Sequence, residues 1–247
     1  MDKVRISAVS YTNTLPFIYG LEHSDVLRDI DLELDVPSEC ARKLIEDRAD
    51  LGIVPVAALL NIPAPEVISD FCLGASGAVD SVFIFSEKPI ESIDTLRIDA
   101  QSRTSNGLAR VLLHHYWKRE VTVVAQGPAD AYVEIGDRTF GKKGDHPYVY
   151  DLSLCWQAYT GLPFAFAVWA ANKTLPATFV RKFNEGLAYG IDHREAVISQ
   201  LTPRLDFDYR TYLMENIDYR YDEGKKKAVA LFLKLLKELE GVQQLVK

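Results

Sequence analysis

The segment FAFAVWA (164–170) is an unbroken apolar run in the second half of the chain, and SVFIFS (81–86) is a similar run nearer the middle. Apolar runs of this length are typical of strands buried on both faces. In a two-lobed fold the chain passes between the lobes twice, so one lobe is built from both ends of the sequence. We predict that these two segments are the crossing strands. Lobe I is then 1–84 together with 170–247, and lobe II is 85–169.

The rest of the chain alternates short apolar runs with helical patterns, which indicates an α/β fold. From Pro176 onward the pattern is mainly helical, with apolar residues at helical spacing. We therefore expect a two-lobed α/β fold in which ligands bind in a central cleft, at the carboxyl ends of strands. Further strands are predicted at 4–9, 32–36, 50–56, 96–100, 121–125 and 131–136.

Composition restricts the class of partner. The chain has 247 residues, of which 48% are hydrophobic and 26% charged, with a net charge of −7. This acidic balance argues against nucleic acid and against an anionic membrane surface as partners. A small anionic ligand is compatible with it if the pocket supplies enough hydrogen-bond donors. The oligomeric state stays open between monomer and dimer.

Two features bear on the compartment. The stretch MDKVRISAVSYTNT has the pattern of a strand rather than of a secretory signal, and no apolar run reaches the ~18 residues of a membrane helix. Cys40, Cys72 and Cys155 form no CxxC pair and are expected to be free thiols in a reducing compartment. We therefore predict a cytoplasmic protein.

Residues 101–113, QSRTSNGLARVLL, place three hydroxyls and an arginine at the start of a predicted helix. One of these hydroxyls is expected as the helix cap, because Ser and Thr are favoured there. A cap needs a single hydroxyl, however, and free backbone N–H groups, the helix dipole and a guanidinium together form an anion site. We therefore predict that a carboxylate or phosphate binds here, with plain capping as the alternative. The binding residues would be Ser102, Arg103, Thr104 and Ser105.

Two further loops are candidates for lining the cleft, because each directly follows a predicted strand. In DLGIVPVAALL (50–60), Pro55 is expected at the first helical position, with the amides near Val56 and Ala57 facing the cleft. The other loop, SYTNTLPF (10–17), offers Ser10, Tyr11, Thr12, Asn13 and Thr14. Polar residues are common in turns, but five in succession at a strand end favour a site.

Acidic and metal-binding candidates are few. Asp137 follows the predicted strand 131–136, and Asp151 precedes the second crossing; such residues are more often caps or turn formers than functional groups.

The five histidines have no HxxxH or HExxH spacing, so no metal site is expected. The motifs GxGxxG, GxxxxGK[ST] and GxSxG are absent, which argues against the common nucleotide-binding and hydrolase classes. No cofactor is predicted.

Taken together, six segments resemble the chorismate dehydratase family of the futalosine route to menaquinone, in the family's order and over residues 4 to about 170. The segments are SYTNTLPF, DLGIVPVAAL, SVFIFS, QSRTS, IGD and DLSLCWQAYTGLPFAFAVW. The resemblance implies the two-lobed fold of type II periplasmic binding proteins. Two departures exist. Thr12 stands where SYLNT is expected, and DLSLCW replaces DLGEEW, which leaves only Asp151 as an acidic residue there.

The resemblance also implies the reaction, in which chorismate loses water to give 3-[(1-carboxyvinyl)oxy]benzoate through a carbon–oxygen lyase activity. Asn13 and Ser81 match family positions that face the substrate, so we expect them to be catalytic by orienting it. One carboxylate of chorismate would bind the turn 102–105. The other would bind Ser10 and Asn13, or the amides after Pro55. Tyr11, Asp137 and Asp151 complete the predicted substrate-binding set.

The general base and two alternative functions stay open. The matched motifs offer no histidine or glutamate, which are the usual bases. Asp137, Asp151 and the substrate's own enolpyruvyl carboxylate remain as candidates. One alternative function is a non-catalytic solute-binding or sensor protein for a small carboxylate, and the other is the sibling 1,4-dihydroxy-6-naphthoate synthase.

Overall fold

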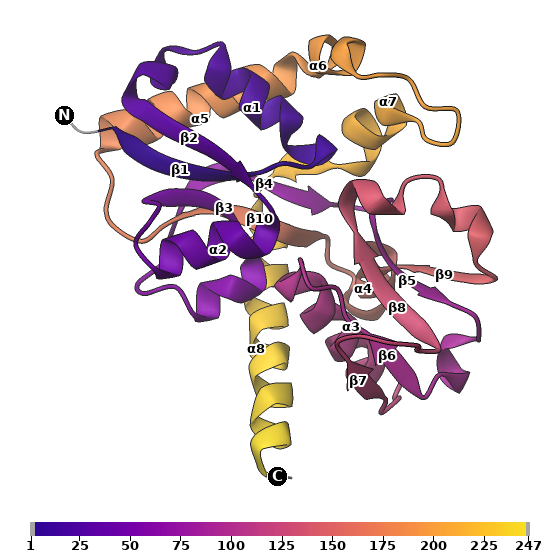
Figure 1. Ribbon diagram of the computed structural model, residues 1–247. Helices are drawn as coiled ribbons and strands as arrows, with labels where there is room; N and C mark the ends of the chain where they lie inside the picture. Colours follow the sequence, from indigo (N-terminus) through magenta and orange to yellow (C-terminus); the bar gives the residue numbers. More distant parts are fainter. Residues whose placement is uncertain (1–2, 246–247) are drawn as a thin grey trace.

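The fold consists of two mixed β-sheets with helices packed around them, arranged as two lobes (Figure 1). The structure is a computed structural model that describes residues 3–245, with their side chains as far as residue 241. The first sheet has six strands in the order β11-β4-β10-β3-β1-β2, and the second has five in the order β7-β6-β8-β5-β9. Both ends of the chain therefore contribute to the first sheet, and the middle of the chain forms the second.

In the six-stranded sheet, β1 runs parallel to β2 and β3, while β10 is antiparallel to β3 and β4, and β11 is antiparallel to β4. Its strands are β1 (Val4–Val9), β2 (Ile30–Asp35), β3 (Leu51–Pro55), β4 (Glu66–Ala75), β10 (Phe164–Ala171) and β11 (Asp218–Arg220).

In the five-stranded sheet, β5 is antiparallel to β8 and β9, whereas β6 is parallel to β7 and β8. Its strands are β5 (Val82–Ser86), β6 (Thr95–Arg97), β7 (Thr122–Val124), β8 (Ala131–Ile135) and β9 (Tyr148–Asp151).

Helices cover both sheets. In the first lobe α1 packs against α5, and α2 packs against β3; in the second lobe α3 packs against α4. The helices are α1 (Leu15–Glu22), α2 (Pro37–Ile45), α3 (Arg103–His115), α4 (Leu152–Thr160), α5 (Ala177–Asp192), α6 (Arg194–Gln200), α7 (Tyr209–Thr211) and α8 (Glu223–Leu245). The predicted helical character of the last quarter of the chain is confirmed.

The chain does pass between the lobes twice, but not within the two apolar strands. All pairing of β5 is with strands of the second sheet, and all pairing of β10 is with strands of the first. The crossings therefore lie just before these strands, at 76–81 and 161–163. The predicted lobe boundaries, which cut through β5 and β10, are wrong for this reason. The two strands are almost entirely apolar because each is an interior strand of its own sheet.

Three strands escaped the sequence reasoning. In β4, Ser69, Asp70 and Gly74 interrupt the apolar pattern. The strands β9 and β11 are only 4 and 3 residues long, too short to display a period. Of the three unpredicted strands, β4 matters most, because β10 pairs with it.

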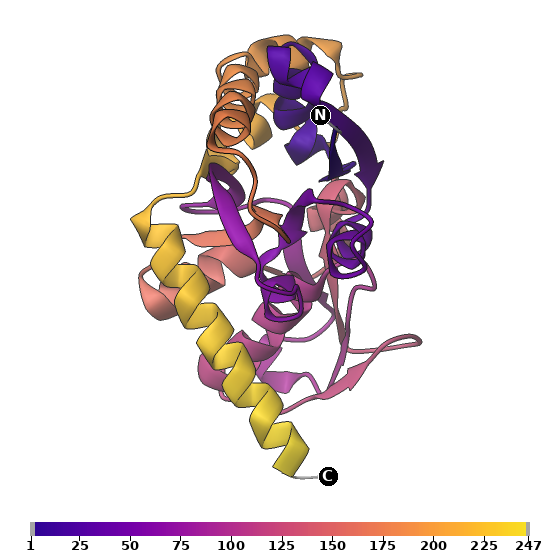
Figure 2. The ribbon, with the colours of Figure 1, turned by 90° about the vertical axis from the view of Figure 1, so that its left-hand side faces the viewer.

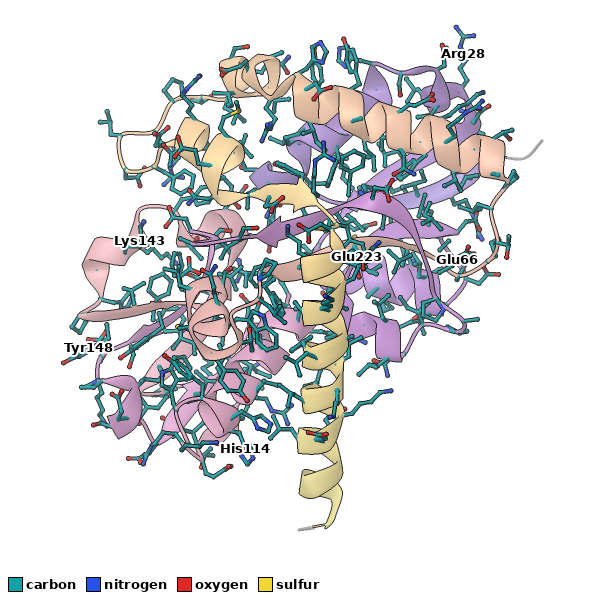
Figure 3. The ribbon with its side chains drawn as sticks, turned by 180° about the vertical axis from the view of Figure 1, so that it is seen from behind. Arg28, Glu66, His114, Lys143, Tyr148 and Glu223 are labelled. Carbon is teal, nitrogen blue, oxygen red and sulfur yellow. The ribbon has the colours of Figure 1, made fainter. Side chains whose placement is uncertain are left out.

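The long helix α8 joins the lobes from behind. It packs against β10 of the first sheet and α3 of the second lobe, and runs along the side of the molecule (Figure 2). Seen from behind, Glu223 at its start lies between Glu66 on the first lobe and Lys143 on the second (Figure 3). Within residues 3–245, none of the helices combines the length and the apolar character needed to cross a bilayer.

Candidate active site

A cleft between the two lobes is the candidate site. Its cavity has a volume of about 60 Å³ in this arrangement, well below the roughly 300–1,000 Å³ of small-molecule sites. Its wall is largely apolar and comes from both sheets, with Val9 and Ala167 on one side and Val82 and Ile135 on the other. The polar side chains that line it are Tyr11, Asn13, Ser81, Ser102, Thr104 and Ser105. The structure thus brings together six residues that the sequence analysis had selected.

The start of α3 points its hydroxyls at this cleft and uses each of them in a defined way. Ser102 is the helix cap, because its Oγ accepts a hydrogen bond from the Ser105 amide at 3.1 Å. The Ser102 hydroxyl in turn donates to Ser105 Oγ at 2.8 Å. Thr104 Oγ1 accepts a hydrogen bond from the Ala57 amide of the first lobe at 3.2 Å. The predicted capping role is confirmed, and the anion-binding role remains a prediction.

Arg103 does not share this position. Its side chain is exposed and lines a separate depression, beside Asn61 and Arg110. Successive residues of a helix point about 100° apart, so a helix that turns Thr104 and Ser105 toward the cleft turns Arg103 away from it. The prediction that Arg103 holds a carboxylate in the cleft is therefore wrong for this arrangement.

The polar residues of the loop after β1 do not all line the cleft, and one of them bonds to the other lobe. Tyr11 and Asn13 line the cleft, whereas Ser10 is exposed outside it. Thr12 bonds across to the second lobe: its Oγ1 lies 2.9 Å from Asp137 Oδ2, and its amide lies 3.1 Å from Asp137 Oδ1. This gives the unusual Thr12 a structural purpose, because its hydroxyl supplies one of the bonds that join the lobes.

Asp137 belongs to the lobe contact and not to the cleft wall. Burial raises the pKa of its carboxyl above the ordinary value, and the hydrogen bonds from Thr12 only partly offset this effect. Its neighbour Gly136 does line the cleft and has a φ of +65°, a conformation that favours glycine. A Cβ at this position would lie 2.7 Å from the Tyr11 ring. Tyr11 thus closes the mouth of the cleft by packing directly against the backbone of Gly136.

Asp151 is a structural cap. It precedes α4, and its Oδ1 accepts hydrogen bonds from the amides of Ser153 and Leu154 at 2.9 and 3.1 Å. Its Oδ2 accepts from the Asp80 amide at 2.9 Å, which fixes the crossing segment. Burial raises the pKa of this carboxyl, against the effect of these backbone donors. The structure does not place Asp151 on the cleft wall, so its predicted contact with substrate is not supported.

The segment after β3 contributes less than expected. Pro55 lines the cleft, but it is the last residue of β3 and precedes a 3₁₀ turn, Val56–Leu60, instead of starting an α-helix. Val56 is fully buried and not part of the wall. The amide of Ala57 is already bonded to Thr104. The Ala57 amide is therefore not free for a ligand in this arrangement, and a ligand contact with the amides after Pro55 stays a prediction.

Asn13 and Ser81 are both held by tyrosines from the far end of the chain. The Tyr219 hydroxyl donates to the Asn13 carbonyl at 2.9 Å, and the Tyr212 hydroxyl donates to Ser81 Oγ at 2.8 Å. Sequence reasoning missed these tyrosines, because partners 206 and 131 residues apart leave no local pattern.

The two lobes touch at several points around the cleft. The Tyr11 hydroxyl donates to Gln101 Oε1 at the mouth. Phe207, which follows α6, stacks on Phe140 of the second lobe with ring centres 3.6 Å apart. Together with the Thr12 and Ala57 bonds, these contacts hold the lobes together around the cleft. The structure therefore represents a closed arrangement of the lobes.

The charge of the cleft is unusual for a site that would bind an anion. Within the described part of the chain, every side chain that lines it is neutral. No cluster of acidic, histidine or cysteine side chains suited to a metal ion occurs among residues 3–241. The cleft wall itself offers a charged ligand hydroxyls, an amide and the amino-terminal end of α3.

Comparison with known proteins agrees with this architecture. Residues 4–238 match the family described as menaquinone biosynthesis. A chorismate dehydratase of Thermus thermophilus is 24% identical over 92% of this chain and 92% of its own length. A chorismate dehydratase of Campylobacter jejuni is 27% identical over 94% of this chain and 96% of its own length.

Solved structures show the same fold at low sequence identity. A protein of Archaeoglobus fulgidus superposes with a TM-score of 0.72 at 16% identity, covering 97% of this chain and 98% of that protein. The periplasmic aliphatic sulphonate binding protein SsuA of Escherichia coli gives a TM-score of 0.59 at 14% identity, covering 100% and 94%. The predicted two-lobed fold of periplasmic binding proteins is confirmed. Because the family match spans nearly the whole chain, the protein belongs to the menaquinone biosynthesis family.

Proposed function

We propose that the protein is a chorismate dehydratase, a lyase that converts chorismate to 3-[(1-carboxyvinyl)oxy]benzoate and water. The observation that carries this proposal is the match to two relatives of that name over more than nine-tenths of both chains. In the reaction a proton leaves the ring carbon that bears the enolpyruvyl ether, and the hydroxyl leaves the neighbouring carbon. The ring becomes aromatic, so the protein's task is mainly to position the substrate and stabilise charge.

The cleft suits such a substrate in its chemistry. Its apolar walls fit the ring, and its polar groups lie in two places. The first is the start of α3, where Ser102 and Ser105 line the wall at the positive end of the helix dipole. The second is the pair Asn13 and Ser81. Each place provides neutral hydrogen-bond donors for one of the two carboxylates of chorismate.

The proton acceptor in this proposal is the enolpyruvyl carboxylate of the substrate. Asp137 and Asp151 are each engaged by hydrogen-bond donors of the protein, and among the described residues no charged side chain lines the cleft. A carboxylate of the substrate is therefore the available base nearest the ring. Asn13 and Ser81 would hold it in place, as residues that orient and do not themselves take the proton.

The direct test is to mix the protein with chorismate and follow the product mass. Loss of one water from chorismate supports the proposal. Binding without mass change would favour a solute-binding protein, and turnover only of the precursor of 1,4-dihydroxy-6-naphthoate would favour the sibling enzyme.

The orienting role has its own test. Asn13→Ala and Ser81→Ala should each lower kcat by roughly 30- to 1,000-fold, or about 2–4 kcal/mol in the barrier, with KM nearly unchanged. Ser92→Ala is a matched control, because Ser92 is exposed and away from the cleft. An Asp137→Asn or Asp151→Asn variant that folds normally yet has no turnover, beside active Asn13 and Ser81 variants, would identify a protein carboxylate as the base.

A further inference from the structure

Tyr212 is a fully buried tyrosine whose hydroxyl reaches the edge of the cleft without lining it. It begins a π-helical turn, Tyr212–Asn216, a rare element that often occurs at functional sites. Its ring packs against Phe140 and Phe207, with ring centres 5.3 and 5.2 Å away. This aromatic packing fixes the direction in which the Tyr212 hydroxyl points.

The hydroxyl of Tyr212 determines what Ser81 can do. Tyr212 donates its only hydroxyl hydrogen to Ser81 Oγ at 2.8 Å. Among the described residues, the hydrogen of Ser81 itself has only a long contact, to the Val79 carbonyl at 3.4 Å. Because Ser81 lines the cleft, this hydrogen is available to a ligand. A hydroxyl that accepts one hydrogen bond also becomes a better donor of the next.

The direction of this chain of hydrogen bonds does not change with pH in the ordinary range. Burial raises the pKa of Tyr212 far above its usual value, so the hydroxyl keeps its hydrogen. The hydrogen bond to Ser81 therefore keeps Tyr212 as its donor.

The residues that follow Tyr212 hold the same two loops. Asn216 donates to the Ala78 carbonyl at 3.2 Å, just before Ser81. Tyr219 donates to the Asn13 carbonyl at 2.9 Å. One short segment near the end of the chain thus supports both the loop after β1 and the crossing segment before β5.

We propose that Tyr212 is a positioning residue for the reaction in the cleft: its hydroxyl occupies the acceptor site of Ser81 and so fixes Ser81 as a donor toward the substrate. This inference rests on the proposed function. It assigns Tyr212 no contact with the substrate, so its effect must pass through Ser81.

The test compares Tyr212→Phe, which keeps the ring and removes the hydroxyl, with the wild-type protein acting on chorismate. We expect kcat to fall about tenfold, the change that corresponds to one ordinary neutral hydrogen bond, with KM within about twofold. Placing p-aminophenylalanine at position 212 restores an N–H donor on the same ring and should recover most of the rate. That variant also serves as the test if Tyr212→Phe does not fold.

A double-variant comparison separates positioning from general support of the fold. In a Ser81→Ala background, Tyr212→Phe should cause no further loss of kcat, because the residue through which Tyr212 acts is gone. The matched control is Tyr209→Phe, since Tyr209 lies in the same aromatic cluster, 5.6 Å from Phe207, but outside the cleft wall. It should retain the wild-type rate.

The outcomes distinguish this inference from the function on which it rests. A wild-type protein that leaves chorismate unchanged overturns both. An active wild-type protein overturns the positioning role alone in either of two cases: Tyr212→Phe keeps the full rate, or its loss multiplies with that of Ser81→Ala. A tenfold loss that disappears in the Ser81→Ala background supports it.

Discussion

Adding one methyl group at Gly136 should weaken ligand binding by opposing the closure of the lobes. The position has a φ of +65°, and the new Cβ would lie 2.7 Å from the ring of Tyr11, which comes from the other lobe. No ordinary carbon contact is that short, so the ring has to move. The Tyr11 hydroxyl would then lose its hydrogen bond to Gln101.

Gly127→Ala provides the reference for the magnitude. Gly127 also has a positive φ, +89°, but a Cβ there meets nothing within 4 Å. Both variants carry the left-handed strain of roughly 1–2 kcal/mol. Gly136→Ala adds the displaced ring and one lost hydrogen bond, about 1 kcal/mol or more. Because this extra part arises only when the lobes touch, it should weaken binding about five- to tenfold relative to Gly127→Ala.

The assay measures Kd for chorismate or a non-reacting dicarboxylate by calorimetry, with the thermal midpoint of each variant. Both midpoints should fall by similar amounts, while Kd rises only for Gly136→Ala. Equal affinities in the two variants would show that Tyr11 yields without cost and that its packing on Gly136 does not govern closure.

Three further predictions follow from residues outside the cleft wall. Burial raises the pKa of the Asp50 carboxyl, but hydrogen bonds from Arg5 and Lys173 outweigh this effect and lower the pKa to about 2. The stability that these bonds give the fold is present above pH ~4 and is lost as pH falls through ~2. Asp50→Asn should therefore unfold more easily by about 2 kcal/mol at neutral pH, and urea titrations should show this difference vanishing near pH 2. Asp151→Ala should lower stability by about 2–3 kcal/mol in the same titrations, because buried N–H groups lose their acceptor, while turnover of the folded fraction persists. Arg103→Ala should keep kcat/KM within about threefold of wild type; a hundredfold loss would return Arg103 to the site.

The fold was predictable because it rests on patterns that repeat along the chain. The apolar runs that became β5 and β10 indicated interior strands, and the alternation with helical segments indicated α/β layers. The points at which the chain changes lobes were not predictable to the residue. A strand has the same apolar pattern whether it crosses between sheets or lies in the centre of one.

The site was predictable only where its residues lie close together in sequence. Ser102, Thr104 and Ser105 are neighbours at a helix start, and Asn13 lies in a polar loop, so local reasoning selected them. Arg103 was selected with them although it does not line the cleft in this arrangement, because composition does not reveal which side of a helix faces the ligand. Tyr212 was missed for the opposite reason, since its position depends entirely on tertiary packing.

The position of β10 in the first sheet has a consequence for synthesis on the ribosome. Both neighbours of β4, namely β10 and β11, are made after the whole second sheet. At cellular translation rates, the interval between the end of β4 and the start of β10 lasts roughly 5 to 20 seconds. During that time β4 has two unpaired edges, which are templates for aggregation. The nascent first lobe is therefore expected to need chaperone protection while the second lobe, a contiguous segment, already folds.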